Sequence, residues 1–149
     1  KGWADVIVAP DAGAAKKTLK AAKVLGFDPN SILYMEKVRD VTNGNITGSR
    51  ILGDTSNLCD FDALIVDDLC DGGGTFIQAA QSLYDAGATS VGLFVTHGIF
   101  SRGYQPLLDA GIDRIWTTDS ITTGNPEHKQ VTVFKSRHIT NEYFLRQEA

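Results

Sequence analysis

The sequence has 149 residues, of which 42% are hydrophobic and 21% are charged, and its formal net charge is −4. This composition excludes a disordered chain, and the acidic balance argues against a general nucleic-acid surface. No apolar run approaches the roughly 20 residues that cross a bilayer, and no signal peptide is visible, so we expect neither a membrane nor a nucleic-acid partner.

The two cysteines indicate the redox compartment. Cys59 and Cys70 have neither CxxC nor metal-ligand spacing, which favours a reduced protein of the cytoplasm over a disulfide scaffold. The chain begins at Lys1 rather than Met and enters an apolar segment almost at once. We therefore expect either a processed chain or a fragment of a longer protein.

The first third of the chain predicts a strand, a helix and a second strand. An apolar run over 5–8 ends at Pro10, and residues 12–22 recur at helical spacing up to Gly26, a suitable C-cap. A second strand is predicted over 31–35. The expected apolar face of the helix consists of Ala12, Ala15, Leu19 and Ala22. We interpret another face as solvated, with Lys16, Lys20 and Lys23.

Residues 38–50 are rich in Asn, Gly and Thr and lack strong periodicity, which predicts a long loop. A short strand near 50–52 is expected to return from it. Long loops inside compact domains are often lids or binding loops.

The rest of the chain continues the alternation of strands and helices. The expected elements are a strand at 62–66, a helix at 76–84 ending at Gly87, a strand at 90–95, a short helix ending at Gly111, strands at 114–117 and 131–134, and a terminal helix at 141–147. Such alternation implies parallel strands joined by right-handed crossovers. The predicted fold is α/β, an open, mainly parallel sheet with helices on both faces, in a single domain over residues 1–149.

Unusual polar clusters follow four of the predicted strands. They read PDAG, EKVR, DDLCDGGGT and THG in chain order. Ligands of open α/β sheets bind outside the carboxyl ends of the strands. The sequence therefore predicts one binding site built from these clusters.

The segment DGGGT, Asp71 to Thr75, predicts a phosphate site. Glycines allow the backbone to approach a ligand closely, and the first N–H groups of a helix are unpaired and attract anions. The three glycines are Gly72, Gly73 and Gly74, and Thr75 adds a hydroxyl. The alternative is a glycine-rich turn in which Asp71 simply caps the helix.

Two acids, Asp67 and Asp68, precede this loop. They would repel a phosphate, but they can accept hydrogen bonds from sugar hydroxyls or approach a divalent cation. A sugar phosphate satisfies the acids and the glycine loop together. The spacing fits neither a Walker A loop nor a dinucleotide fingerprint.

These residues resemble a known family. A strand, two acids and D-x-G-G-T are similar to the loop that binds phosphoribosyl diphosphate (PRPP) in the type I phosphoribosyltransferase fold. Further segments resemble the ribose-phosphate pyrophosphokinases, which make PRPP: VIVAPDAGAAKK at 6–17, MEKVRD at 35–40, VTHGIFS at 95–101 and TTDSI at 117–121. Gly72 stands where that family usually has Thr, and Ala9 and Ala14 replace Ser and Gly. The resemblance covers only the family's C-terminal half; the missing half supplies most of the adenine pocket.

The resemblance implies transfer of diphosphate from ATP to ribose 5-phosphate. If the resemblance holds, the loop from Asp71 to Thr75 would bind the 5-phosphate. Asp67 and Asp68 would bind the ribose hydroxyls, and Asp11 would help to bind a Mg²⁺ ion. Lys37 and Arg39 would be the catalytic pair that closes over the transferring group, and Arg39 would also contact substrate. The resemblance also implies a homo-oligomer, or an N-terminal half that is missing from this chain.

Other interpretations remain open. Asp11 could cap the first helix, Lys37 and Arg39 could be ordinary exposed charges, and His97 is better read as a packed histidine or a subunit contact. The whole chain could instead be a phosphoribosyltransferase that consumes PRPP, or a non-catalytic homologue that binds sugar phosphates.

Overall fold

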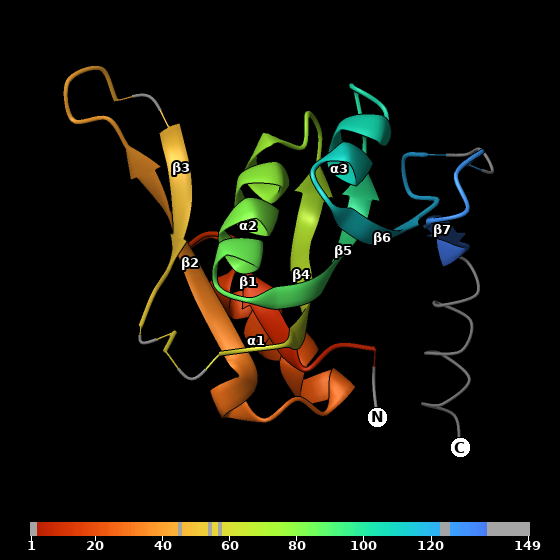
Figure 1. Ribbon diagram of the computed structural model, residues 1–149. Helices are drawn as coiled ribbons and strands as arrows, with labels where there is room; N and C mark the ends of the chain where they lie inside the picture. The colour runs from red at the N-terminus through yellow and green to blue at the C-terminus, as the bar shows by residue number, and fades with distance from the viewer. Residues whose placement is uncertain (1–2, 45, 54, 57, 123–125, 137–149) are drawn as a thin grey trace.

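The computed structural model describes residues 3–44, 46–53, 55–56, 58–122 and 126–136. Within these residues one sheet has the strand order β3-β2-β1-β4-β5-β6-β7 (Figure 1). The elements are β1 (Val6–Ala9), α1 (Ala15–Leu25), the 3₁₀ helix η1 (Pro29–Ser31), β2 (Ile32–Arg39), β3 (Ile46–Ile51), β4 (Phe61–Cys70), α2 (Gly74–Asp85), β5 (Ala88–Gly98), α3 (Gln105–Asp109), β6 (Ile112–Thr118) and β7 (Val131–Phe134). Among the paired strands of the described residues only β2 and β3 run antiparallel, which confirms the predicted mainly parallel sheet.

The two faces of the sheet carry separate apolar clusters. On β1, Ile7 packs with Ala22 of α1, whereas its neighbours Val6 and Val8 belong to the larger cluster with Leu83 of α2. Successive side chains of a strand point to opposite faces, so α1 and α2 cover opposite sides of the sheet. Figure 1 shows α2 and α3 in front of the strands and α1 behind them. Helices on both faces are thus confirmed.

The apolar face predicted for α1 is wrong in part. Leu19 is 52% exposed, and the helix instead buries Thr18 and Ala22. Thr18 can be buried because its hydroxyl lies within hydrogen-bond distance of the carbonyl oxygens of Ala14 (3.0 Å) and Val66 (3.4 Å). The predicted solvated face is confirmed, since its lysines are all exposed: Lys16, Lys20 and Lys23.

The predicted long loop over 38–50 is wrong, because most of it forms a hairpin. β2 extends to Arg39 and pairs with β3, and Lys37 lies opposite Ser49. Figure 1 shows the far end of this hairpin protruding beyond the rest of the sheet. A protruding ribbon buries little side-chain surface, so its backbone can pair without the apolar alternation that marks a strand in the sequence.

Two strands continue beyond their predicted ends. β4 and β5 stay paired to Leu69–His97 and Cys70–Gly98, so the two acids and His97 lie within strands rather than after them. Backbone pairing does not depend on side-chain polarity, which accounts for the difference. His97 is exposed and its Nδ1 lies 2.8 Å from the Ser120 hydroxyl, so its reading as a packed histidine is wrong.

One predicted helix cannot be compared with the structure. The terminal helix predicted at 141–147 lies outside the described residues. No helix in the part of the chain that the structure describes is long and apolar enough to cross a membrane.

Candidate active site

A pocket of about 510 Å³ lies where β1 and β4 end and α2 begins. It brings together three carboxylates, on Asp11, Asp67 and Asp71, and the whole glycine loop. The remaining lining residues are Leu69, Phe76 and Gln78. The clusters after the first and third predicted strands therefore meet in one site, as the topology rule predicts.

The glycine loop has the geometry of an anion site. Gly73, the N-cap of α2, has a φ of +78°, and a Cβ there would lie 2.9 Å from Leu107 Cδ2. A Cβ at Gly74 would meet nothing within 4 Å. Among the described residues no hydrogen bond pairs the N–H groups of Gly74 or Thr75, and these point outward at the positive end of the helix dipole.

Asp71 does not serve as a simple helix cap. Within the described chain its carboxylate accepts no hydrogen bond, and the N-cap position belongs to Gly73. The alternative interpretation of the loop as a capped turn is therefore wrong, and the first N–H groups of α2 stay available to a ligand.

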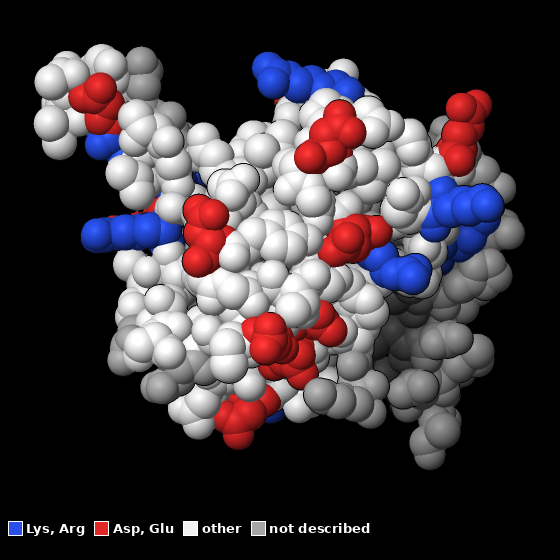
Figure 2. Space-filling model, viewed as in Figure 1, with Lys and Arg blue, Asp and Glu red and all other residues white. Residues whose placement is uncertain are grey.

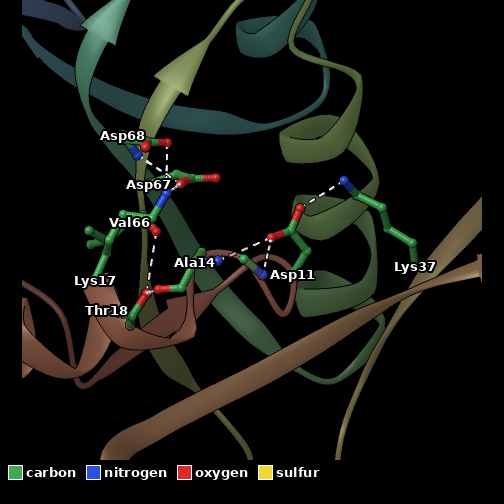
Figure 3. Close-up of polar contacts among 9 residues, drawn as sticks. Asp11, Ala14, Lys17, Thr18, Lys37, Val66, Asp67 and Asp68 are labelled. Atoms are coloured by element: carbon green, nitrogen blue, oxygen red, sulfur yellow. Dashed lines mark hydrogen bonds and ion pairs between the residues drawn. The ribbon is translucent and has the colours of Figure 1, made fainter.

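Lys17 holds both strand acids. Its Nζ lies 2.9 Å from Asp67 Oδ1 and 2.8 Å from Asp68 Oδ1, as Figure 3 shows. The side chain of Asp67 is 13% exposed and lines the pocket, whereas that of Asp68 is 56% exposed and lies outside it. Lys17 thus offsets negative charge next to the anion site.

Sequence reasoning missed Lys17, although it lies in the segment 6–17 that carried the family resemblance. Its position follows from packing. The buried Thr18 hydroxyl contacts the Val66 carbonyl, and this contact places the preceding lysine beside the acid that follows Val66. The uncompensated pair of acids was the one available signal that a cation had to lie nearby.

The two acids have opposite pKa shifts. Burial raises the pKa of Asp67, and the hydrogen bond from Lys17 opposes this only in part. Hydrogen bonding from Lys17 lowers the pKa of the exposed Asp68 carboxyl. Asp67 is therefore expected to bind a proton at higher pH than Asp68.

Replacing Lys17 by Met is expected to raise the pKa of both Asp67 and Asp68, because the shared cation is lost. Carboxyl ¹³C NMR titration measures both, and Lys20→Met, an exposed lysine on the same helix, is the control. Because the folded-state pKa of Asp68 is depressed, its stabilising effect is present above the unfolded pKa and is lost as the pH falls. The stability of the Lys17→Met variant should therefore fall less as the pH is lowered, because the contribution of the Asp68 ion pair is already absent. An unchanged Asp68 pKa in Lys17→Met would contradict the ion-pair assignment.

Asp11 and Lys37 form the second polar contact of the site. Asp11 Oδ1 accepts from the N–H groups of Gly13 (3.0 Å) and Ala14 (3.2 Å), and Oδ2 pairs with Lys37 Nζ at 2.7 Å (Figure 3). Asp11 thus closes the turn before α1 rather than capping the helix itself. Partial burial acts to raise its pKa, but Lys37 and the two N–H groups outweigh this, and the pKa of Asp11 is lowered.

Asp11 has the donor chemistry that Mg²⁺ requires. Its carboxylate is ionised and reaches the pocket, but the described residues contain no group of three or more acidic, His or Cys side chains that could hold a metal. Mg²⁺ commonly binds through one or two carboxylates and takes its other ligands from water and phosphate oxygens. The residues present therefore fit such an ion only together with a phosphorylated ligand, and the ion would compete with Lys37.

The structure does not bring Arg39 to the pocket. Arg39 donates to the Gly44 carbonyl at 3.2 Å, at the tip of the β2–β3 hairpin, and a register irregularity separates it from Val38. Lys37, from the same strand, reaches the site through Asp11. Of the predicted catalytic pair, Lys37 therefore lies next to the site, whereas Arg39 lies near the tip of the hairpin.

Comparison with known proteins gives the same result as the motifs. A model of the phosphoribosyl transferase domain matches residues 2–135. The ribose-phosphate pyrophosphokinase of Corynebacterium efficiens is 33% identical over 129 residues, which cover 86% of this chain and 38% of that protein. The chain therefore spans about two fifths of the length of the curated relatives it matches.

Solved structures agree on the fold. A phosphoribosylpyrophosphate synthetase from Mycobacterium smegmatis superposes with a TM-score of 0.74 at 27% identity, covering 96% of this chain and 45% of that one. An adenine phosphoribosyltransferase from Thermoanaerobacter pseudethanolicus shares the fold, with a TM-score of 0.58 at 22% identity, over 76% of this chain and 69% of that chain. The resemblance to the C-terminal half of ribose-phosphate pyrophosphokinases is thus confirmed. With the glycine loop, the paired acids and a domain match over nearly all described residues, the chain belongs to the phosphoribosyl transferase domain family.

Proposed function

We propose that this chain is the part of a ribose-phosphate pyrophosphokinase that binds ribose 5-phosphate and promotes transfer of diphosphate to it from ATP. The observation that carries the proposal is the shared pocket, in which the anion site of Asp71–Thr75 lies with Asp67 and with Asp11, the partner of Lys37. A sugar phosphate needs both an anion site and hydroxyl acceptors, and this pocket offers both.

Each end of ribose 5-phosphate has a complementary group. The 5-phosphate would accept hydrogen bonds from Gly74, Thr75 and the loop before them, where the helix dipole favours negative charge. Asp67 would accept hydrogen bonds from the ribose hydroxyls, with Asp68 beside it. Lys17 supports this assignment, because it keeps both carboxylates in place and reduces their repulsion of the phosphate.

In the proposed reaction the anomeric oxygen of ribose 5-phosphate bonds to the β-phosphorus of ATP. The bond from that phosphorus to the oxygen bridging the α- and β-phosphates breaks, AMP leaves, and the hydroxyl proton is released. Mg²⁺, held in part by Asp11, would neutralise phosphate charge when bound. Lys37 would then exchange its contact with Asp11 for the transferring group. Arg39 would join it only if it leaves the Gly44 carbonyl.

Two measurements test the proposal. Calorimetry on the chain should detect ribose 5-phosphate binding that ribose without phosphate does not reproduce. A chimera in which this chain replaces the matching part of the Corynebacterium efficiens relative should release AMP when ATP, ribose 5-phosphate and Mg²⁺ are supplied. The chain alone should turn over very slowly or not at all, because no adenine site is evident in the sequence.

The alternatives predict different results. Binding in the chain with an inactive chimera would favour a non-catalytic sugar-phosphate-binding homologue. Consumption of PRPP with a nucleobase would favour a phosphoribosyltransferase, and absence of any binding would contradict the proposal.

The proposal extends to the setting of the reaction. We expect a cytoplasmic protein that uses ATP and that forms a homo-oligomer or works together with an N-terminal half missing from this chain. Two free cysteines, one of them exposed, fit a reducing compartment.

A further inference from the structure

The turn after β5 is anchored to the strand that leads into the glycine loop. The N–H groups of Ile99 and Phe100 donate to the Cys70 carbonyl, at 2.8 and 3.2 Å, and Gly103 N–H donates to the Phe100 carbonyl at 2.8 Å. Phe100 is buried with a φ of +48°, and its ring packs on Tyr104. The backbone on both sides of residue 102 is therefore held at the end of β4.

This turn carries an arginine to the glycine loop. A Cβ at Gly72 would lie 3.8 Å from Arg102 Nε and 4.0 Å from its Cδ, so the side chain passes directly over the loop. Figure 2, viewed as Figure 1, shows Lys or Arg side chains protruding into solvent at the top of the molecule, the end at which α2 begins. Residue 102 is separated from the loop by about thirty positions in the sequence, and only the pairing of β4 with β5 brings the two together.

Arg102 differs from the other cations near the pocket. Lys17 pairs with Asp67 and Asp68, and Lys37 pairs with Asp11. In the described part of the chain Arg102 makes neither a hydrogen bond nor an ion pair. Its guanidinium therefore keeps all its donors for a ligand.

The carboxylates that line the pocket leave a bound phosphate in need of a positive counter-charge. Among the described residues, three carboxylates line the pocket and no Lys or Arg does, whereas a phosphate monoester carries close to two negative charges at neutral pH. The helix dipole supplies only about half a positive charge. A full positive charge beside the loop is needed to balance the bound phosphate, and Arg102 is in place to provide it.

We propose that Arg102 is a phosphate-binding residue, which folds over Gly72 and donates to the phosphate bound in the Asp71–Thr75 loop. The inference rests on the proposed function for its ligand, ribose 5-phosphate, but it extends to inorganic phosphate at the same loop. An arginine suits this position because its planar fork can donate two parallel hydrogen bonds to phosphate oxygens.

Calorimetry on the full chain tests the inference, with ribose 5-phosphate, inorganic phosphate and ribose as separate probes. Arg102→Met should weaken both phosphate-containing probes about tenfold, as expected for loss of a charge-assisted contact, and Arg102→Lys should retain part of the affinity. The affinity of Arg102→Met should also depend less on NaCl concentration than that of the parent chain. Arg114→Met, which removes the same charge from an exposed position near the amino end of β6, is the matched control.

The outcomes separate this inference from the proposed function. Parent affinity in Arg102→Met, or equal losses in Arg102→Met and Arg114→Met, would overturn the role of Arg102 even if ribose 5-phosphate binds. Arg102-dependent binding of inorganic phosphate without binding of ribose 5-phosphate would support Arg102 and reject the sugar-phosphate assignment. Absence of binding by either phosphate probe would overturn both.

Discussion

Gly74→Val is expected to lower the affinity for ribose 5-phosphate on the order of a hundredfold, or about 3 kcal/mol. A side chain at Gly74 meets no protein atom within 4 Å and would occupy the pocket where the phosphate is proposed to lie. It would also block the N–H groups of the first turn of α2. Two hydrogen bonds to a charged ligand are each worth about 1.5–3 kcal/mol, which sets the size of the loss.

The position allows this test without unfolding the chain. Gly74 has no positive φ and begins α2, where Val is no worse a helix former than Gly. Gly73→Val would be uninformative, because its φ is +78° and Leu107 lies too close. Gly48→Val, another glycine with open space and no positive φ, is the control. Equal ribose 5-phosphate affinity in the two folded variants would show that the phosphate does not bind in this loop.

Lys37→Met is expected to lower turnover of the chimera by about 10²- to 10³-fold, as for other lost transition-state contacts, while ribose 5-phosphate affinity changes little. Lys37 Nζ lies 2.7 Å from Asp11, at the rim of the pocket and not at the glycine loop. Its positive charge is therefore placed to act on the transferring group rather than on the bound sugar phosphate. Initial rates of AMP release and calorimetry on the same variant separate the two effects.

Two related variants define the result. Arg50→Met removes a charge from the same hairpin whose partner is Glu36, and it should leave turnover nearly unchanged. Arg39→Met should lower turnover only if Arg39 leaves the Gly44 carbonyl during the reaction. Removal of Lys37 should also raise the pKa of Asp11, which NMR detects independently of activity. If Lys37→Met keeps near-parent turnover, Lys37 has no catalytic role and the alternative interpretation as an ordinary exposed charge is correct.

Local patterns in the sequence were sufficient for the class of fold and for the centre of the site. Strands and helices alternate with clear periodicity, so the parallel sheet with helices on both faces followed from the order of elements. The glycine loop and Asp67 were found because all their functional groups lie within nine consecutive residues, 67–75. Glycines that precede a helix start favour an anion site whatever the rest of the chain does, because the groups that bind the anion belong to the local backbone.

Local patterns failed where side-chain burial does not control the structure. The part of the β2–β3 hairpin within residues 38–50 was predicted as a loop, because a ribbon at the sheet edge needs no apolar alternation. Thr18 was passed over as a core residue, because its burial depends on a carbonyl of β4, 48 positions away. Neither contact leaves a periodic signal.

Only the tertiary structure decided which charged side chains reach the pocket. Lys17 and Asp67 are 50 positions apart, and they meet because β4 pairs beside β1 and α1 packs across both strands. Arg102 reaches Gly72 because the β4–β5 ladder continues to Cys70 and Gly98. Conversely, Arg39 shares a strand with Lys37 yet lies at the hairpin tip. The sequence determined the chemistry of the loop, whereas sheet order and register determined its counter-charges, since long-range contacts are set by packing and not by spacing along the chain.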